Sequence, residues 1–501
     1  MNGSSRGQQG VSDDFMQRNT PRRALILGGG LAGLAASVRL REVGFHITLV
    51  EAKNRLGGRA TSFDDPQSGI TVDNCQHILL RCCTNLIDFY HRLGVLEHIT
   101  RHDSFYFASR HPDTTGNTTH IDTLKRNLLL PAPFHLAFSF LKFRALSIPD
   151  KLALARGVRS LISAQREDLE NISFYDFLKH NEQPDQLINR FWEVIIISAC
   201  NGSVRRVSAS YAAQVFQTGF LNHAEAFIMG IPSGPLRDLY DPALSLIDDL
   251  RLGKRVNTVK INNDNGESPK VISVTLHDGC VLDDFDVVVV ALPAERLPAL
   301  FANAPSAVDL SFTRAVRLET SPIVSIHLWF DRSITRLPHI AFLDHDIQWV
   351  FFKDEGKYAH IVISAADDWV SISQEDILLR VLDDLHTAFP DATLSNVKSS
   401  RIIKEKHATF LPAPGCDAFR PGNTTAIANL FLAGDYTQTG WPATMEGAVR
   451  SGYLASRAAV LYMNENNLIQ RTSPSTLVVP DLVPDLPSSL LYRILRDIPV
   501  I

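Results

Sequence analysis

The stretch RALILGGGLAGLAASVRLREVGFHITLVEAKNRLGGR, residues 23–59, decides the fold of this chain. It opens with a short apolar run at 23–27, passes through three consecutive glycines, and continues as an Ala- and Leu-rich run to about Val43. A second short apolar run, 46–50, ends at Glu51. Short apolar runs bounded by glycine predict strands, and the longer Ala/Leu-rich segment predicts a helix. The stretch therefore predicts a strand, a tight turn, a helix and a second strand.

The glycines of the turn have the spacing G-x-G-x-x-G, at Gly28, Gly30 and Gly33. The first glycine permits the tight turn, the second lets the backbone approach a pyrophosphate, and the third lets helix and strand pack closely. The start of the helix then offers unpaired N–H groups to phosphate. Glu51 ends the next strand at the place where a carboxylate binds ribose hydroxyls. This pattern predicts a Rossmann-type dinucleotide-binding domain in an α/β protein.

Length and composition narrow the class of protein. At 501 residues the chain exceeds what one hydrophobic core usually serves, so we expect about two or three lobes. With 45% hydrophobic and 21% charged residues it has the composition of a folded globular protein. A net charge of −5 argues against nucleic acid as a partner. The six cysteines lack zinc-ligand spacing, so we predict no metal site and a reduced compartment.

The rest of the chain shows alternating helical and strand-like segments. Residues 79–252 have mostly helical spacing and predict a helical lobe. Strand-like alternation follows at 271–276, 287–292, 323–330, 349–352 and 360–364, which predicts a sheet packed against those helices. The chain then returns to a strand at 429–433, which leads through a turn into a long helix that we place in the first domain.

A resemblance to a known family appears at the end of the opening stretch. Residues 28–59, with GLAA following the glycines and LGGR at 56–59, resemble the FAD signature of amine oxidases, protoporphyrinogen oxidases and carotenoid desaturases. In addition, Arg59 can offer a forked donor to phosphate. The resemblance implies an FAD cofactor. The FAD contacts it implies in this stretch are Gly28, Gly30, Leu31, Ala32, Gly33, Glu51, Ala52, Gly58 and Arg59.

The resemblance extends to the far end of the chain. FLAGDYTQTGWPATMEGAVRSG, residues 431–452, is similar to the C-terminal flavin motif of phytoene desaturases and squalene-associated desaturases. It implies that Gly434 and Asp435 contact the ribityl chain, and that the helix beginning near Met445 and Glu446 points at the flavin pyrimidine ring. A weaker similarity, at LRLGKRVNTVKI, implies a backbone contact from Val256 to adenine; an ordinary core valine is the alternative there.

Two motifs indicate the substrate. DNCQHILL, residues 73–80, resembles the DNGQH segment of hydroxysqualene dehydroxylases, although Cys75 replaces the usual glycine, and TGWPATMEGAVRSG is close to that family's form. The resemblance implies a long apolar pocket in which hydroxysqualene loses its hydroxyl with help from a proton donor and receives hydride from reduced FAD to give squalene. The candidate donors are His77, Asp73 and Glu446, and for each a structural hydrogen-bonding role is the alternative.

Other functions stay open at this point. The nearest is a carotenoid desaturase that acts on phytoene or a relative in the oxidative direction. An amine oxidase shares the same flavin signature, and the Rab-escort and GDI proteins share the architecture as non-enzymatic prenyl-binding proteins.

A segment of the helical lobe predicts contact with lipid. LLLPAPFHLAFSFLKFRALSI, residues 128–148, carries apolar bulk with Lys142 and Arg144 near its end. It is too short to span a bilayer but could lie in the interface and admit a lipid substrate, with a buried core helix as the alternative. No uninterrupted apolar run of about 18 residues occurs in the chain. We therefore expect a cytoplasmic protein that associates peripherally with the inner face of the cell membrane and binds a long-chain isoprenoid.

The expected architecture is a Rossmann-type, glutathione-reductase-like FAD-binding domain with a discontinuous α+β substrate domain and a helical lobe. We assign residues 1–21 to a disordered leader, and residues 22–80, 250–300 and 425–464 to the FAD-binding domain. Residues 81–249 and 301–424 form the substrate-binding and helical lobe, and residues 465–501 form a peripheral tail.

Overall fold

The computed structural model describes residues 22–66, 69–113, 116–262, 268–302, 310–389, 392, 397–466, 473–487 and 490. The predicted leader, residues 1–21, lies outside the described residues, as does most of the tail. Among the described residues, no helix is both long and apolar enough to cross a membrane.

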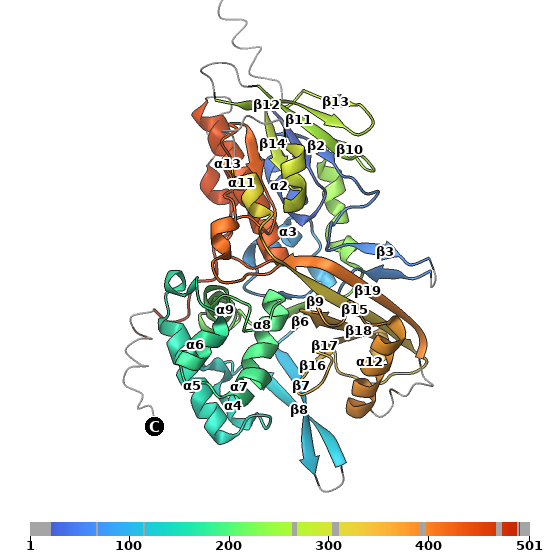
Figure 1. The fold of residues 1–501 in the computed structure, drawn as a ribbon, viewed down its shortest axis with the longest axis vertical. Coiled ribbons are helices and arrows are strands. Elements are labelled where there is room, and N and C mark those ends of the chain that lie inside the picture. The colour runs from blue at the N-terminus through green and yellow to red at the C-terminus, as the bar shows by residue number, and fades with distance from the viewer. Residues whose placement is uncertain are drawn as a thin grey trace, which may run out of the picture.

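A five-stranded parallel sheet forms the centre of the upper half of the molecule (Figure 1). Its order is β10-β2-β1-β14-β20, so strands from the beginning, the middle and the end of the chain lie side by side. Every residue of the VVVV strand β14 is buried, as expected for a parallel sheet with both faces covered. The strands are β1 (Arg23–Leu27), β2 (His46–Val50), β10 (Asp249–Arg251), β14 (Val287–Val290) and β20 (Leu430–Leu432). The sheet confirms the predicted α/β class.

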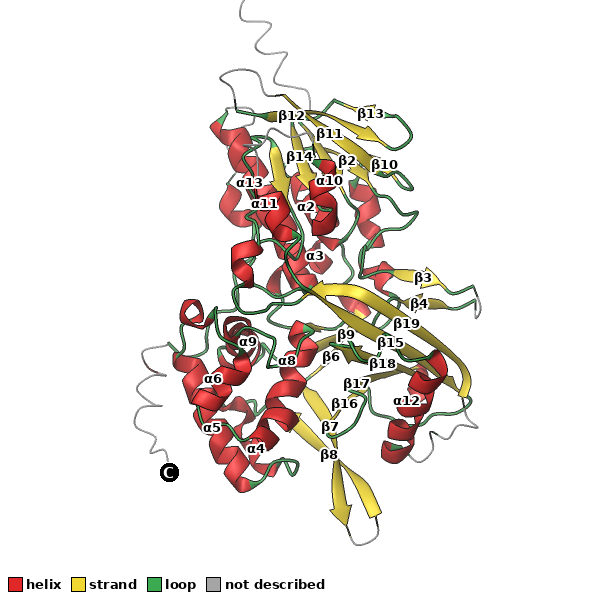
Figure 2. Cartoon of the chain, viewed as in Figure 1, coloured by secondary structure: helices red, strands yellow, loops and turns green. Residues whose placement is uncertain are grey.

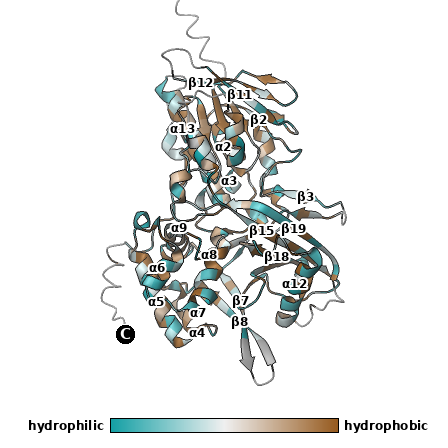
Figure 3. Ribbon diagram, in the orientation of Figure 1, coloured by the Kyte–Doolittle hydropathy of each residue, from teal (hydrophilic) through white to brown (hydrophobic). Residues whose placement is uncertain are grey.

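Two helices with remote sequence positions pack on each other beside this sheet. α2 (Leu31–Glu42) follows the glycine turn, and α13 (Met445–Glu465) follows β20. They make a close contact at Gly452, where a side-chain Cβ would lie 2.3 Å from the backbone oxygen of Ala32. A small antiparallel sheet borders the domain, formed by β11 (Val256–Asn262), β12 (Lys270–Leu276) and β13 (Val281–Leu282). In Figure 3 the strands drawn beside the labels β2 and β12 are coloured mostly brown, which marks hydrophobic residues.

The lower half of the molecule has a helical side and a sheet side (Figure 2). A seven-stranded sheet has the order β19-β15-β18-β17-β16-β7-β8, and α12 (Gln374–Ala388) buries its apolar face against it. The strands are β7 (Ser104–Asp113), β8 (Gly116–Lys125), β15 (Thr320–Phe330), β16 (His339–Phe342), β17 (Trp349–Lys353), β18 (Tyr358–Ser364) and β19 (Val397–Phe410). The alternation at 323–330, 349–352 and 360–364 thus predicted three strands of one sheet correctly.

The helical lobe lies on the other side, and short elements connect the two halves. Its helices are α4 (Ala137–Lys142), α5 (Ile148–Ser163), α6 (Phe174–His180), α7 (Asp185–Leu187), α8 (Glu193–Cys200) and α9 (Ala209–Phe216), with π-helical turns at Ile188–Trp192 and Gln217–Leu221. The remaining elements are α3 (Thr84–Arg92), α10 (Leu297–Leu300), α11 (Leu310–Ala315), β3 (Ser62–Asp64), β4 (Thr71–Asp73), β5 (Leu79–Leu80), β6 (Ile99–His102) and β9 (Met229–Pro232).

The prediction that residues 79–252 are largely helical was wrong for six strands of the described residues, β5 to β10. The hairpin β7–β8 joins the seven-stranded sheet, and β9 pairs with both β5 and β6. The partners of β9 lie more than a hundred residues away along the chain, so no local pattern marks them. In β7, Phe105 and Phe107 face the helical lobe while Ala108 packs with the α12 side, so apolar residues occur on both faces and the alternation is weak.

The C-terminal strap, residues 473–487, ties the two halves together. Arg39 of α2 donates to the carbonyl of Leu477 at 3.1 Å, and further on Asp485 accepts from the backbone N–H groups of Ala132 and Ala224, each at 2.9 Å. Leu482 packs against Cys82, Ala226 and Trp441 between these points. This part of the predicted peripheral tail is held by backbone hydrogen bonds, which its scattered apolar residues do not reveal.

We predict that Gly452→Ala lowers the free energy of unfolding by about 1–3 kcal/mol, because its Cβ would push α13 away from the backbone of α2. Thermal melting of the purified variant measures this. Gly422→Ala is the matched control, since a Cβ there meets nothing within 4 Å. Equal melting temperatures for the two variants would show that the helices do not depend on this close contact.

Candidate active site

The glycine turn between β1 and α2 has no room for side chains on its packed side and an open face on the other. A Cβ at Gly28 would lie 2.5 Å from the carbonyl oxygen of Ala291, and one at Gly33 would lie 2.0 Å from the carbonyl oxygen of Gly28. At Gly30 the nearest atom would be the Cα of Gly58, at 3.8 Å. Two glycines are therefore needed for packing, and the third leaves the backbone accessible to a ligand.

Glu51 directly follows β2 and binds the backbone of the glycine turn. Its carboxylate accepts from the backbone N–H of Gly29 and from that of Lys53, each at 2.8 Å. Each carboxylate oxygen retains a lone pair for a further donor such as a ribose hydroxyl. Ala52 follows it and is exposed, whereas Leu31 and Ala32 are buried at the start of α2, where the first turn carries no acidic residue. No acidic side chain of the helix's own first turn therefore opposes phosphate binding.

Arg59 connects the beginning of the chain to its end. In the loop that carries Arg59, Gly57 forms an isolated β-bridge with Gly30 of the glycine turn. One guanidinium nitrogen of Arg59 lies 2.6 Å from the carboxylate of Asp435, which is 376 residues away, and another donates to the carbonyl of Ala408 at 2.9 Å. The Asp435 side chain is only 8% exposed, and its charge raises the pKa of Arg59. Half of the Arg59 side chain is open, which leaves donors for a phosphate.

The start of α13 follows directly from this pair. Gly434, with φ of 147°, donates to the hydroxyl of Ser451 at 2.7 Å and so bends the chain away from β20. Thr444 caps the helix by accepting from the N–H of Gly447 at 3.1 Å. Met445, the first residue of α13, lines a pocket.

Glu446 is fully engaged with protein groups. Its carboxylate accepts from the N–H of Leu86 at 2.8 Å, from the amide of Asn85 at 3.0 Å and from Arg450 at 3.1 Å. Burial raises the pKa of Glu446, and the Arg450 guanidinium opposes that shift. These contacts tie the first turn of α13 to α3.

The other two candidate donors are Asp73, the last residue of β4, and His77, in the segment that follows it. Asp73 is buried and accepts from the hydroxyl of Ser62 at 2.7 Å and from the N–H of Leu236 at 2.9 Å. His77 donates from Nδ1 to the carbonyl of Cys75 at 2.8 Å, and burial lowers the pKa of His77. At neutral pH this ring is therefore uncharged, holds its proton on Nδ1 and presents Nε2 as an acceptor.

A buried polar cluster beside this segment was not predicted. His327 of β15 and His360 of β18 are cross-strand partners, and the hydroxyl of Ser325 lies 2.7 Å from Nε2 of His360. The hydroxyl of Tyr358 lies 2.6 Å from Nδ1 of His327. Burial lowers the pKa of His327 to about 3 and that of His360 well below its usual range. The two histidines lie in different strands, and only the register of β15 and β18 brings them together.

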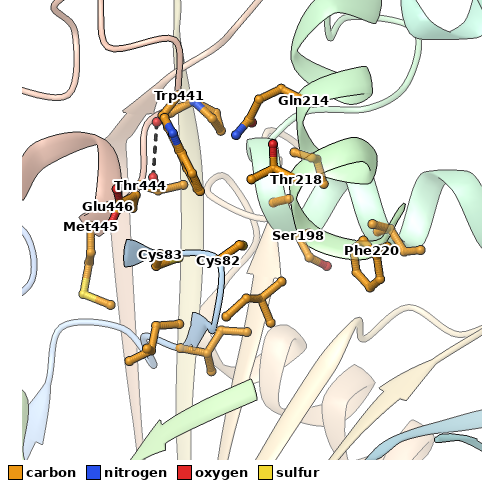
Figure 4. Close-up of a pocket in the computed structure, with 18 of the residues that line it drawn as sticks. Cys82, Cys83, Ser198, Gln214, Thr218, Phe220, Trp441, Thr444, Met445 and Glu446 are labelled. Carbon is orange, nitrogen blue, oxygen red and sulfur yellow. Dashed lines mark hydrogen bonds between the residues drawn. The ribbon is translucent and has the colours of Figure 1, made fainter. Parts of the chain in front are cut away.

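A large apolar pocket lies next to the start of α13 (Figure 4). The empty space at this site, part of which is open to solvent, is about 1060 Å³. Its walls come from the DNCQHILL segment, β7, β8, β17, α8, α9 and α13, and include Ile78, Leu80, Phe105, Phe107, Trp349 and Trp441. The pocket therefore adjoins both motifs that indicated a substrate.

Of the residues implied to hold FAD, one group meets around the glycine turn, and Val256 lies separately at the start of β11. Those at the glycine turn, at Glu51 and at Gly58 and Arg59 are brought together with Gly434 and Asp435. Val256 begins β11, with a register shift between Val256 and Thr258, and its side chain is half-buried. The open backbone at Gly30, the phosphate-compatible helix start and the donors of Arg59 fit a flavin dinucleotide.

We predict that Arg59→Met reduces FAD retention roughly ten-fold, because it removes a phosphate donor and leaves the buried Asp435 carboxylate without its cation. Equilibrium dialysis of FAD against the purified variant measures this. Arg55→Met is the matched control, since Arg55 is exposed and stacks over Phe63. If Arg59→Met retains FAD as well as the control does, the pair does not contribute to the cofactor site.

Comparison with known proteins places this geometry in a family. The chain is 27% identical over 482 residues to a probable zeta-carotene desaturase of Synechococcus elongatus, covering 87% of this chain and 98% of that protein. It is 25% identical over 470 residues to the 15-cis-phytoene desaturase of Solanum lycopersicum, covering 88% of this chain and 78% of that protein.

Solved structures share the fold. An oxidoreductase from Methanosarcina mazei superposes with a TM-score of 0.64 at 19% identity, over 86% of this chain and 98% of that one. Putrescine oxidase superposes with a TM-score of 0.61 at 17% identity, over 88% and 98%. The family described as flavin containing amine oxidoreductase matches residues 31–460. With its nucleotide turn, its remote flavin motif and this match across most of its length, the chain belongs to the flavin-containing amine oxidoreductase family.

Proposed function

We propose that this protein is an FAD-dependent oxidoreductase that acts on a long-chain isoprenoid. The observation that carries the proposal is the apolar pocket that adjoins the start of α13, beside the residues that fit the dinucleotide. Such walls suit a hydrocarbon chain, because the hydrophobic effect rewards apolar area removed from water. The acidic residue in the lining, Glu446, is already paired with Arg450, which leaves it poorly suited to bind an amine cation.

Several residues of this chain would hold the cofactor. The backbone of Gly28, Gly30 and Gly33 and the start of α2 would face the pyrophosphate, and Glu51 would bind a ribose. Arg59 would donate to a phosphate, and its ion pair with Asp435 would hold the two remote segments together at the site. When bound, FAD supplies the ability to accept or deliver a hydride.

Of the three candidate proton donors, Asp73 and Glu446 have structural roles, and His77 is a proton acceptor. We assign Asp73 and Glu446 to the fold, because backbone N–H groups and side chains already occupy their carboxylates. His77 is neutral and presents Nε2, so it fits the role of proton acceptor better than that of the acid expected for dehydroxylation.

Desaturation of a carotene-like chain is the direction that the relatives support. The chain is 27% identical to a probable zeta-carotene desaturase over 87% of its length. Reductive loss of the hydroxyl of hydroxysqualene is the second candidate. It is favoured by the two sequence motifs at 73–80 and 439–452 and by Gln214 of the pocket lining, whose Oε1 has no hydrogen-bond partner among the described residues.

Two anaerobic incubations test this proposal. Oxidised holoprotein is mixed with phytoene or zeta-carotene, and photoreduced holoprotein with hydroxysqualene, with products identified by mass spectrometry. We expect turnover of a long isoprenoid in one arm, as loss of two hydrogens or as squalene. Putrescine serves as the small amine comparison. Turnover of putrescine with no reaction in either isoprenoid arm would contradict the proposal.

We also propose that a membrane-facing patch admits the substrate. Segment 128–148 is neither one interfacial helix nor one buried helix. Its apolar side chains divide: Leu136, Phe143 and Leu146 are buried, whereas Leu128, Leu129, Phe138, Leu141 and Ile148 are between 55% and 91% exposed. The cationic side chains of Lys142 and Arg144 are exposed beside them, as suits an anionic lipid surface. The ring centres of Phe143 and Phe107 are 5.3 Å apart, and Phe107 lines the pocket. The segment that carries the patch therefore packs against the pocket wall.

We predict that Leu128→Ser combined with Leu129→Ser weakens binding to anionic vesicles at least about ten-fold, because two exposed leucines no longer enter the lipid. Flotation with liposomes measures the bound fraction. Leu379→Ser combined with Val281→Ser is the matched control, as these residues are also exposed but lie on α12 and β13. Equal flotation of the two double variants would refute the assignment of the patch.

A further inference from the structure

One polar side chain stands out in the apolar pocket. Gln214 of α9 is 3% exposed, lines the pocket, and its Oε1 has no hydrogen-bond partner among the described residues. A buried amide without a partner is costly, and native proteins rarely leave one unpaired. Figure 4 shows the Gln214 side chain extending from its helix toward the side of the pocket where Trp441 is drawn.

The other polar side chains of the lining are mostly satisfied within the protein. The hydroxyl of Ser198 donates to the carbonyl of Val194 and accepts from Trp349, each at 2.7 Å. Thr444 caps α13, and Glu446 is bound to α3 and Arg450. Gln214 therefore differs from them, because its Oε1 makes no hydrogen bond to the described part of the chain.

Thr218 adds a second polar atom next to Gln214. It lies four residues further along the same helical segment, in the π-helical turn Gln217–Leu221, and it also lines the pocket. Residues four apart on a helix project from one face. Figure 4 shows the two side chains side by side at the pocket wall. Together an amide and a hydroxyl can both accept from and donate to one ligand oxygen.

We propose that Gln214 and Thr218 form a binding subsite for a single hydroxyl on an otherwise hydrocarbon ligand. A hydroxyl both donates and accepts, so it pairs with the amide whichever way the amide is turned. The ligand class is thus a long-chain isoprenoid alcohol. This inference rests on the proposed function, whose substrate class it narrows.

The subsite is tested by measuring the binding of two probes to the oxidised holoprotein. Without reduced flavin no hydride is available, so a bound alcohol is not converted during the measurement. The probes are hydroxysqualene and squalene, both C30 chains, of which only the first carries a hydroxyl. Quenching of the fluorescence of Trp441 and Trp349 in the pocket wall reports binding. We expect the wild-type protein to bind the alcohol about ten-fold more tightly than the hydrocarbon.

Variants assign that preference to the two residues. Gln214→Met and Thr218→Val remove hydrogen bonding at similar size, and each should reduce the preference to about two-fold by weakening alcohol binding, with squalene affinity kept within about two-fold. Thr218→Ser keeps the hydroxyl and should retain the preference. Gln374→Met, at the exposed start of α12, is the control for loss of an amide elsewhere.

The possible failures are distinct. Equal binding of both probes by the wild-type protein, or an unchanged preference in both Gln214→Met and Thr218→Val, would overturn the subsite and leave the proposed function standing. Binding of neither probe would also overturn the subsite, whereas the proposed function is decided separately by the incubations with phytoene, zeta-carotene and hydroxysqualene. The squalene affinity of each variant shows that its pocket is intact.

Discussion

The contact between Arg59 and Asp435 is the constraint on which the rest of the structure depends. It joins the loop after β2 to the turn before α13, across 376 residues of sequence. The same two segments also meet through α2 and α13 at Gly452, and through β1, β14 and β20 in one sheet. Between these contacts the chain leaves the nucleotide domain twice. It returns to the sheet first at β10 and β14, and then at β20.

These two excursions of the chain build the pocket. The segment after β4 supplies one wall, the hairpin β7–β8 and the helical lobe supply others, and the start of α13 supplies the wall nearest to the nucleotide residues. The carboxylate of Glu446 in the pocket lining is paired with Arg450, and the other side chains of the lining are mostly apolar. An apolar cavity suits a hydrocarbon chain. The strap at 473–487 then closes the outside of the same region.

The sequence predicted best what local pattern controls. Residues 23–27 and 46–50 form strands with the predicted bounds, because glycines and apolar runs mark them without reference to other segments. It predicted least where partners are remote: β9 depends on β5 and β6, and Glu446 depends on Asn85 and Arg450. The same holds for the site, where motif spacing located the nucleotide residues. The polar pair Gln214 and Thr218 lies on an otherwise unremarkable helix, and only the shape of the pocket draws attention to it.

The central claim is that one FAD is held jointly by the two ends of this chain. Hydrogen–deuterium exchange of the protein with FAD bound and with FAD removed tests it most directly. We expect peptides from residues 28–34 and from residues 434–447 to gain protection together, at the same FAD concentration, because both contribute to a single site. Protection of only one of these segments, or of neither, would contradict the account.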